Sequence, residues 1–278
     1  MSAGMPPDAL ELPALTKLLC NGDVKGCCAA AYAHPAVRWL LGDELHPGGK
    51  ATTRRALELI AVGPGERLLD VASGSGDSAV LAAREHGCVV TGIDFGEAAV
   101  VDARRPADAA GVRDRVAFRV GDAEALPFAD ESFDAVLCEC SLCTFPDKRR
   151  ALAEVRRGLR PGGRVAIADV LADHARLPPS LRGPLATAAC VGGALSRDDL
   201  LRLIDSSGFR LLDIRLCTRE AAEMAERVHD RLRGARVIGA DRIVGSALAI
   251  EQAIEMAAAA RAAIEQGALD YAIFAAAR

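Results

Sequence analysis

One decapeptide constrains the fold more than any other part of the chain: Leu68-Leu69-Asp70-Val71-Ala72-Ser73-Gly74-Ser75-Gly76-Asp77. A short apolar run leads into a loop that contains two glycines, and a helical pattern follows through Ala83. Glycine lets the backbone approach a ligand closely, and the N-terminus of a helix carries free N–H groups. The segment therefore predicts a strand, a ligand-binding loop and a helix in succession.

Apolar runs of strand length alternate with helical patterns along the rest of the chain. We expect strands at 67–71, 88–93, 116–120, 133–137, 164–170, 209–217 and 269–276. Helical spacing covers 51–61, 97–110, 148–159, 196–207, 220–233 and 243–265. Strands that alternate with helices of about 10–15 residues are typical of a parallel sheet covered on both faces. The predicted fold class is therefore α/β, with a doubly wound seven-stranded sheet.

Four regions are expected: an N-terminal cap (1–50), a core (51–217), a helical insertion before the last strand (218–267) and a last core strand (268–278). Several prolines in the cap favour short helices over a separate domain. In the insertion, apolar side chains recur every three or four residues, at Ile243, Ala247, Ile250, Ile254 and Ala258. This stripe predicts a lid over the crevice or the face of a homodimer. The alternative is that the helices cover a sheet edge in a monomer.

Charge and composition exclude several classes of partner. The chain has 34 Lys and Arg against 38 Asp and Glu, a net charge of −4, and 4% aromatic residues. Nucleic-acid binders need clustered positive charge and stacking rings, so no such partner is expected. The apolar stretch 243–264 carries Glu251, Glu255 and Arg261, and residues 1–19 lack a basic start, so neither a membrane span nor a secretion signal is expected. The nine cysteines are therefore expected to be thiols in the cytoplasm.

The glycine loop alone is compatible with NAD, FAD or another nucleotide. The strict G-x-G-x-x-G pattern fails because its third position falls on Ala79. The acidic Asp70 directly before the loop would repel a pyrophosphate but suits a cationic amino-acid ligand. Asp94 ends the second expected strand, where a carboxylate accepts hydrogen bonds from ribose hydroxyls. After the third strand, Gly121-Asp122-Ala123-Glu124 offers an acceptor for an adenine amino group.

Together these motifs resemble the class I S-adenosylmethionine-dependent methyltransferases, with their Rossmann-like fold. The resemblance covers roughly 51–209 and includes Ala125-Leu126-Pro127-Phe128 and the turn Leu159-Arg160-Pro161-Gly162-Gly163 before strand five. It implies S-adenosylmethionine as cofactor, with the loop facing the methionine part, Asp94 the ribose, and Asp122 with Ala123 the adenine. The cofactor-binding residues implied in this way are Asp70, Ala72, Gly74, Gly76, Asp94, Phe95, Asp122, Ala123 and Cys138.

The cysteines gather where a methyl acceptor would lie. Three follow strand four (Cys138, Cys140, Cys143), Cys190 follows strand five, and the cap holds Cys20, Cys27 and Cys28. The carboxyl ends of strands four and five open onto the crevice, so these thiols can converge. Cys88 and Cys217 lie in strands and are expected to be buried. No second C-x-x-C pair accompanies Cys138-x-Cys140-x-x-Cys143, so thiolates for a soft ion such as trivalent arsenic are favoured over a closed metal clip.

Three segments resemble the arsenite methyltransferase family: Gly26-Cys27-Cys28, the stretch from Glu139 to Lys148 that includes Pro146-Asp147, and Cys190-Val191-Gly192-Gly193-Ala194-Leu195. The resemblance implies that Cys140 and Cys190 bind the arsenic, with Cys28, or else its neighbour Cys27, as third ligand. Residues 28–51 and the helical stretch 218–267 depart from that family's pattern.

The expected reaction is an in-line attack on the sulfonium methyl by the lone pair of thiolate-bound arsenic, which needs no general base. Alignment of the two groups then supplies the rate enhancement. One alternative is a methyltransferase for an oxygen, nitrogen, carbon or sulfur centre of an organic metabolite, with His46 or His174 as base. A second is a non-enzymatic protein that binds S-adenosylmethionine or a metalloid.

Overall fold

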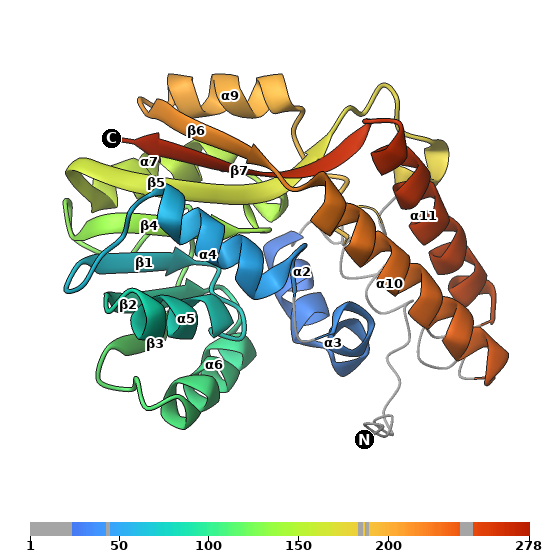
Figure 1. The fold of residues 1–278 in the computed structure, drawn as a ribbon, viewed down its shortest axis with the longest axis horizontal. Helices are drawn as coiled ribbons and strands as arrows, with labels where there is room; N and C mark the ends of the chain where they lie inside the picture. Colours follow the sequence, from blue (N-terminus) through green and yellow to red (C-terminus); the bar gives the residue numbers. More distant parts are fainter. Residues whose placement is uncertain (1–23, 43–44, 183–185, 187–188, 240–246) are drawn as a thin grey trace.

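The computed structural model describes residues 24–42, 45–182, 186, 189–239 and 247–278. Within these ranges seven strands form one sheet in the order β3-β2-β1-β4-β5-β7-β6 (Figure 1). The strands are β1 (Arg67–Val71), β2 (Val89–Asp94), β3 (Val116–Val120), β4 (Phe133–Glu139), β5 (Leu159–Ala172), β6 (Arg210–Leu216) and β7 (Leu269–Ala277). The predicted α/β class with a doubly wound seven-stranded sheet is confirmed.

One strand departs from the expected parallel arrangement. β1 pairs in parallel with β2 and β4, and β4 with β5, whereas β7 is antiparallel to both β5 and β6. The sheet is therefore mixed. β5 is also longer than predicted, because Leu159 already pairs with Phe133 and the Pro-Gly-Gly segment lies inside the strand at a register shift.

Successive side chains of a strand point to opposite faces, and here both faces are buried. Leu68 and Leu137 pack in one hydrophobic cluster, while Leu69 and Val136 pack in the other. On the first face lie α4 (Gly49–Leu59), α5 (Asp77–Glu85) and α6 (Glu97–Ala109). The second face is covered by α7 (Lys148–Gly158) and α9 (Arg197–Ser206) (Figure 1). This explains why the strand sequences read as continuous apolar runs.

The chain reverses direction across the sheet between β1 and β4, and a crevice opens at the carboxyl ends of strands beside such a switch point. The part of residues 1–48 that the structure describes contains two short helices, α2 (Val24–Ala33) and α3 (Pro35–Leu41). Contacts between α2 and α6, and between α2 and the short helix η1 (Leu142–Thr144), place α2 across this end of the sheet. Cys20 lies outside the described residues.

The insertion forms two helices, α10 (Thr218–Val237) and α11 (Ala247–Glu265), which pack against each other (Figure 1). Ile250, only 1% exposed, joins Leu232 and Ala257 in a separate cluster against which Trp39 of α3 packs. Of the predicted stripe, Ile254 is partly buried there and Ala258 is exposed, while Ile243 lies outside the described residues. The stripe therefore packs within its own chain in part, and a lid or homodimer role stays a prediction.

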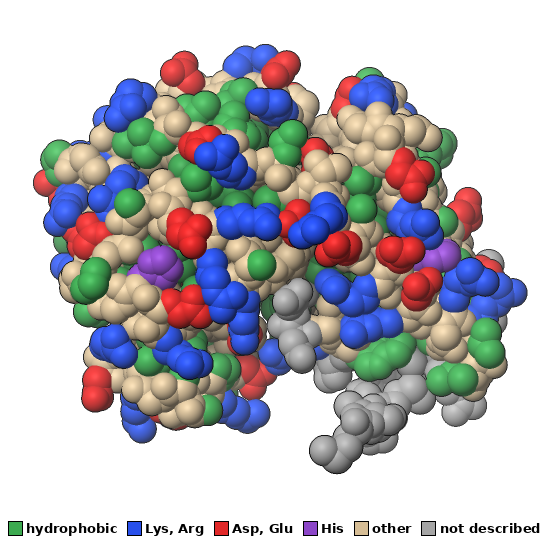
Figure 2. All heavy atoms as spheres, viewed as in Figure 1, with side chains coloured by type: hydrophobic (Ala, Val, Ile, Leu, Met, Phe, Trp, Pro, Cys, Tyr) green, Lys and Arg blue, Asp and Glu red, His purple; other side chains and the backbone are tan. Residues whose placement is uncertain are grey.

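Basic and acidic side chains are interspersed over the face shown in Figure 2. Among the helices of the described residues, none is long and apolar enough to cross a membrane.

Candidate active site

A large pocket lies at the carboxyl ends of β1, β2, β3 and β4, beneath α2. It has about 1470 Å³ of empty space, including open solvent at its mouth. Its walls include the glycine loop, Asp94, Asp122, Glu139 and Cys140. Every cofactor-binding residue that the sequence indicated, except Gly76 and Cys138, is among the lining residues.

The glycine loop uses its two glycines differently. A Cβ on Gly74 (φ +50°) would meet only Leu45 Cδ1, at an ordinary contact distance of 3.7 Å. A Cβ on Gly76 (φ +79°) would lie 2.6 Å from Phe118 Cζ, so this glycine lets α5 pack against β3. Ala72 adopts the left-handed region as well (φ +57°). Gly74 is therefore the glycine that allows a ligand to approach, and Gly76 the one that allows the helix to pack.

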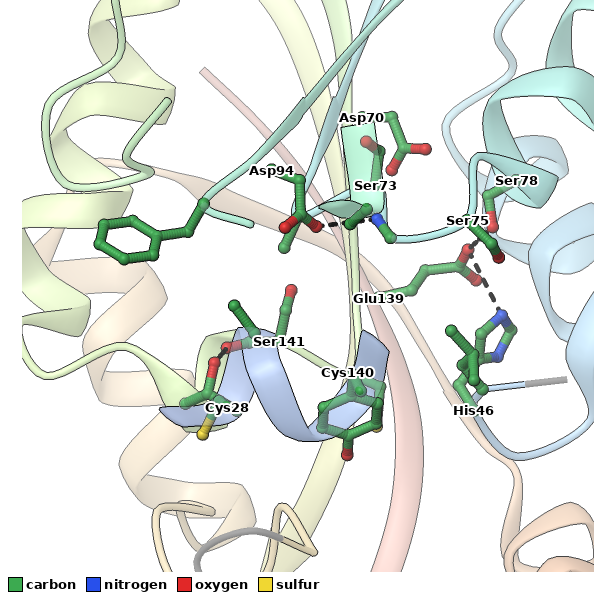
Figure 3. Close-up of a pocket in the computed structure, with 18 of the residues that line it drawn as sticks. Cys28, His46, Asp70, Ser73, Ser75, Ser78, Asp94, Glu139, Cys140 and Ser141 are labelled. Carbon is green, nitrogen blue, oxygen red and sulfur yellow. Dashed lines mark hydrogen bonds and ion pairs between the residues drawn. The ribbon is translucent and has the colours of Figure 1, made fainter. Parts of the chain in front are cut away.

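Asp94 ends β2 and fixes the loop from the next strand. Its Oδ2 accepts a hydrogen bond from Gly74 N at 2.9 Å (Figure 3), and its Oδ1 accepts one from Gly96 N at 2.8 Å. Burial raises the pKa of Asp94, and these backbone hydrogen bonds oppose the shift. Phe95, 45% exposed, lines the pocket beside it. A carboxylate at this place suits the ribose hydroxyls of a nucleoside.

Asp122 and Ala123 follow β3 at the far end of the pocket. The Lys25 ammonium of α2 lies 2.8 Å from Asp122 Oδ2 and 2.7 Å from Glu124 Oε2. Asp122 also accepts a hydrogen bond from Glu124 N at 2.9 Å. The ion pairs hold the beginning of α2 against the segment that the sequence assigns to adenine.

Glu139, which sequence reasoning did not select, closes the pocket floor at the end of β4. Its carboxylate accepts hydrogen bonds from Ser78 Oγ at 2.6 Å and Thr53 Oγ1 at 3.1 Å, and His46 Nε2 lies 3.7 Å away (Figure 3). Asp70, 3% exposed, lines the same floor, and burial together with the charges of Glu139 and Asp94 raises its pKa well above the usual range. In the sequence, the only indication of a role for Glu139 in the site was its position directly before Cys140.

These residues fit S-adenosylmethionine. An open glycine loop, an acid after β2 and acids on the floor suit a nucleoside joined to a positively charged amino acid. Cys138 does not line the pocket, contrary to the expectation, because its side chain points into the sheet's second hydrophobic cluster. Its Sγ lies 3.1 Å from Ser141 Oγ, and burial raises the pKa of Cys138 to about 12.

Three thiols meet behind the pocket wall. Cys190 Sγ lies 2.8 Å from the Tyr32 hydroxyl and 3.6 Å from the Cys140 carbonyl oxygen, and its thiol also interacts with those of Cys140 and Cys143. Cys140 lines the pocket, whereas Cys190 and Cys143 are buried behind it. Cys140 (φ +49°) and Cys190 (φ +64°) both adopt the left-handed region, which costs free energy for a residue with a side chain. Tyr32 and Cys143 were not among the predicted site residues.

The thiols differ in acidity. Hydrogen bonds from Cys140, Cys143 and Tyr32 hold the pKa of Cys190 well below its ordinary value. The hydrogen bond to Cys190, with burial, raises the pKa of Cys140. Cys190 is therefore the thiol that ionises first. Beside the cluster, Asp169 Oδ2 accepts a hydrogen bond from Cys143 N at 2.8 Å.

The remaining candidates lie as follows. Cys28, on α2, lines the pocket and is 6% exposed. Among the described residues, no three His, Cys, Asp or Glu side chains are arranged to hold a metal ion. Cys88 and Cys217 are fully buried, as expected. His174 lies outside the pocket and contacts Ala194 O through Nε2 at 2.8 Å.

The fold and the site together define a class I methyltransferase, whose cofactor is S-adenosylmethionine. The family model of the methyltransferase domain matches residues 63–208, more than half of the chain, and the chain belongs to this family.

The chain is similar to two curated methyltransferases and to one solved methyltransferase structure. An arsenite methyltransferase of Halobacterium salinarum is 39% identical over 157 residues, which span 55% of this chain and 40% of that protein. The 27-O-demethylrifamycin SV methyltransferase of Amycolatopsis mediterranei is 39% identical over 144 residues, 48% of this chain and 53% of that one. Phosphoethanolamine N-methyltransferase 2 of Haemonchus contortus, solved with S-adenosyl-L-methionine, has a TM-score of 0.72 at 21% identity, over 99% of this chain and 61% of that one. The chain thus spans about half the length of the curated relatives, and the solved structure shows the shared fold.

Proposed function

We propose that this protein methylates a trivalent arsenical held by cysteine thiolates. The observation that carries the proposal is the convergence of two thiols from loops 50 residues apart: Cys140 lines the cofactor pocket, and Cys190 lies in contact with it directly behind the wall. Soft thiolates are the ligands that a soft thiophilic centre prefers. The relative from Halobacterium salinarum, an arsenite methyltransferase, supports the same acceptor.

A third thiolate has to come from one of two places. Cys28 lines the pocket from α2, as the sequence resemblance implies, and Cys143 already touches Cys190 from the buried side. A three-coordinate arsenic centre requires one of them to move toward the Cys140–Cys190 pair. We favour Cys28, because it lines the pocket whereas Cys143 does not.

Methyl transfer to arsenic requires little acid–base catalysis by the protein. S-adenosylmethionine, when bound, supplies an electrophilic methyl group. The thiols must lose their protons as they bind arsenic, and binding drives that ionisation. Cys190 begins the process because its thiol is the most acidic of the three. The pocket wall then holds the arsenic in place, so that positioning provides the rate enhancement.

The test compares single Cys→Ser variants on arsenite and methylarsenite, with products measured by mass spectrometry. Cys140→Ser and Cys190→Ser should each lower methylation at least 100-fold while S-adenosylhomocysteine affinity stays within twofold. The matched control is Cys88→Ser, a buried thiol away from the pocket, which should retain methylation. The pair Cys28→Ser and Cys143→Ser identifies the third ligand. Full methylation by the Cys140 and Cys190 variants would overturn the proposal.

A separate observation favours a second class of methyl acceptor. His46 lines the pocket with Nε2 3.7 Å from Glu139 Oε2 and 3.5 Å from Thr53 Oγ1, an arrangement that suits a general base for a hydroxyl or amine. The relative from Amycolatopsis mediterranei, named a methyltransferase of 27-O-demethylrifamycin SV, supports an organic acceptor. A panel of phenols, amines and thiols assayed with native protein and His46→Gln separates the two. Turnover of an organic acceptor that falls at least tenfold in His46→Gln favours this second class.

Two further proposals concern the cellular compartment and the oligomeric state of the protein. Among the cysteines that the structure describes, Cys88, Cys138, Cys140, Cys143, Cys190 and Cys217 are free thiols, which suits a reducing compartment, and we propose the cytoplasm. A homodimer is proposed through the exposed end of α10, where Val237 is 85% and Ile238 is 75% exposed. Sedimentation of native protein and of a Val237→Glu/Ile238→Glu variant tests the dimer, and a monomeric native protein excludes it.

A further inference from the structure

Helix α10 of the insertion contacts the chain on both sides of one wall of the cofactor pocket. It packs beside α3, as Figure 1 shows. Glu220, in the first turn of α10, contacts the beginning of α4, and Arg231, eleven residues later, contacts the end of α3. Eleven helical residues span about 16 Å, so the two contacts are well separated. Neither side chain lines the pocket itself.

The first contact joins Glu220 to the turn that begins α4. Gly48 is the N-cap of α4 and has a left-handed backbone (φ +75°). A Cβ on Gly48 would lie 2.8 Å from Glu220 Cγ and closer still to Thr52 Oγ1, so glycine allows α10 to pack here. Glu220, 8% exposed, lies with Oε1 2.6 Å from Arg55 Nη1. A buried carboxylate is costly without its partner, so the ion pair holds the first turn of α10 against α4.

The second contact joins Arg231 to the end of α3. Arg231 Nη1 donates hydrogen bonds to Trp39 O at 2.6 Å and to Leu40 O at 3.0 Å. These carbonyls belong to the last turn of α3, where backbone carbonyls lack partners within the helix. A positive group at the C-terminus of a helix also offsets the partial negative charge there. Arg231 therefore caps α3 from a distant part of the chain.

Between these two contacts along the chain, Leu45 and His46 line the pocket. Leu45 Cδ1 lies 3.7 Å from the position that a Cβ on Gly74 of the glycine loop would take. His46 Nε2 lies 3.7 Å from Glu139 Oε2 and 3.5 Å from Thr53 Oγ1 (Figure 3). Contacts at such distances do not fix a backbone by themselves. The place of this wall therefore depends on what holds its two ends.

We propose that Glu220 and Arg231 are positioning residues for the cofactor. From outside the pocket they hold the two ends of this wall, and so keep Leu45 against the glycine loop and His46 beside Glu139. A wall that is already in place binds more tightly, because it need not be ordered when the ligand arrives. This role differs from that of a lid, since the support does not move on binding. It uses the cofactor S-adenosylmethionine and is independent of the methyl acceptor.

Calorimetry with S-adenosylhomocysteine tests the proposal on the full chain. Glu220→Ala and Arg231→Met should each weaken binding about tenfold, the loss that follows when the wall is in place about a tenth of the time. Glu220→Gln keeps an acceptor and Arg231→Lys keeps a donor, so these variants should bind within threefold of native affinity. The matched controls are Glu223→Ala and Arg233→Ala, at exposed positions of the same helix, which should bind within twofold.

Two further measurements separate positioning from general destabilisation. Hydrogen exchange, followed by mass spectrometry, should rise in peptides that cover 45–50 in Glu220→Ala and Arg231→Met and stay native in β1 and β4. Methylthioadenosine lacks the amino acid that the sequence places at the glycine loop. Its affinity should therefore stay within twofold of native in both variants.

Two results would overturn the proposal. Native affinity for S-adenosylhomocysteine in both variants would show that the wall keeps its place without α10. An equal loss for methylthioadenosine, or faster exchange throughout the sheet, would show that Glu220 and Arg231 only stabilise the fold. Should Glu220→Ala fail to fold, the same criteria apply to Arg231→Met. Failure of the arsenite assays, with these affinities changed as expected, would refute the proposed acceptor alone.

Discussion

The two halves of the pocket are built in different ways. The cofactor half consists of the glycine loop, Asp94 and Asp122, all at strand ends within about 50 residues of one another. Its hydrogen bonds run largely between side chains and nearby backbone, as between Asp94 and Gly74 N. The thiol half consists of Cys140, Cys143, Cys190 and Tyr32. Its contacts join segments that are far apart in the chain, since Tyr32 and Cys190 are 158 positions apart.

The two halves also suit different chemical groups of a ligand. The cofactor half presents oxygen acceptors and acids, which suit hydroxyls and an ammonium group. The thiol half presents sulfur with one acidic thiol, which suits a soft electrophilic centre. Helix α2 belongs to both halves, because Lys25 contacts Asp122 at one end and Tyr32 contacts Cys190 at the other. The following predictions test whether the halves are independent.

The largest effect is expected from pH on the thiol half. Burial, with the nearby charge of Cys190, raises the pKa of Asp169 from 3.8 to about 7. The folded protein therefore binds this proton more tightly than the unfolded chain, so the stabilisation is full below pH 4 and is lost as pH rises through 7. Between pH 5 and pH 8 the free energy of unfolding should fall by about 2–3 kcal/mol from this group. Urea unfolding at several pH values measures it.

Asp169→Asn should remove that part of the pH dependence and leave S-adenosylhomocysteine affinity within twofold. The control is Asp108→Asn, an exposed aspartate, whose pH dependence should match the native protein. An Asp169→Asn curve parallel to the native one would show that the carboxyl is not the titrating group.

A smaller effect is expected from the cofactor half. Asp94→Ala removes the acceptor that we propose for the ribose and releases Gly74 N, so S-adenosylhomocysteine should bind about 10- to 100-fold more weakly, or about 1–3 kcal/mol. Arsenite should still protect Cys140 and Cys190 from alkylation in this variant, as measured by mass spectrometry. Loss of that protection would mean that the two halves are not independent.

The smallest effect is expected where α2 reaches the thiols. Tyr32→Phe removes the hydroxyl 2.8 Å from Cys190 Sγ, which raises the pKa of that thiol. Alkylation of Cys190 at pH 7 should slow about three- to tenfold, because a neutral hydrogen bond contributes about 1 kcal/mol. The fully buried Cys217 is the internal control. Faster alkylation would show that the ring shields the thiol more than the hydroxyl activates it.

The sequence by itself determined the strands of the sheet and which residues follow them at their carboxyl ends. Strand and helix patterns are local, so apolar runs such as 67–71 and the glycine loop could be read without tertiary contacts. The position of Asp94 could be predicted in the same way. It ends the strand that follows the glycine loop, and in a doubly wound sheet that strand end lies beside the loop. The convergence of Cys140 and Cys190 also followed from the sheet, since both come after strands that end at the crevice.

Only the tertiary structure decided the antiparallel direction of β7, which depends on how α10 and α11 return the chain to the sheet. It also decided that Cys143 points toward Cys190, because strand alternation ends at Glu139 and a left-handed Cys140 turns the chain. The contacts of Tyr32 and Lys25 depend on where α2 packs. The proximity of Glu139 to Asp70 depends on the strand order, because β1 and β4 are neighbours in the sheet but far apart in the chain. Local propensity carries no information on such long-range pairings, which packing alone selects.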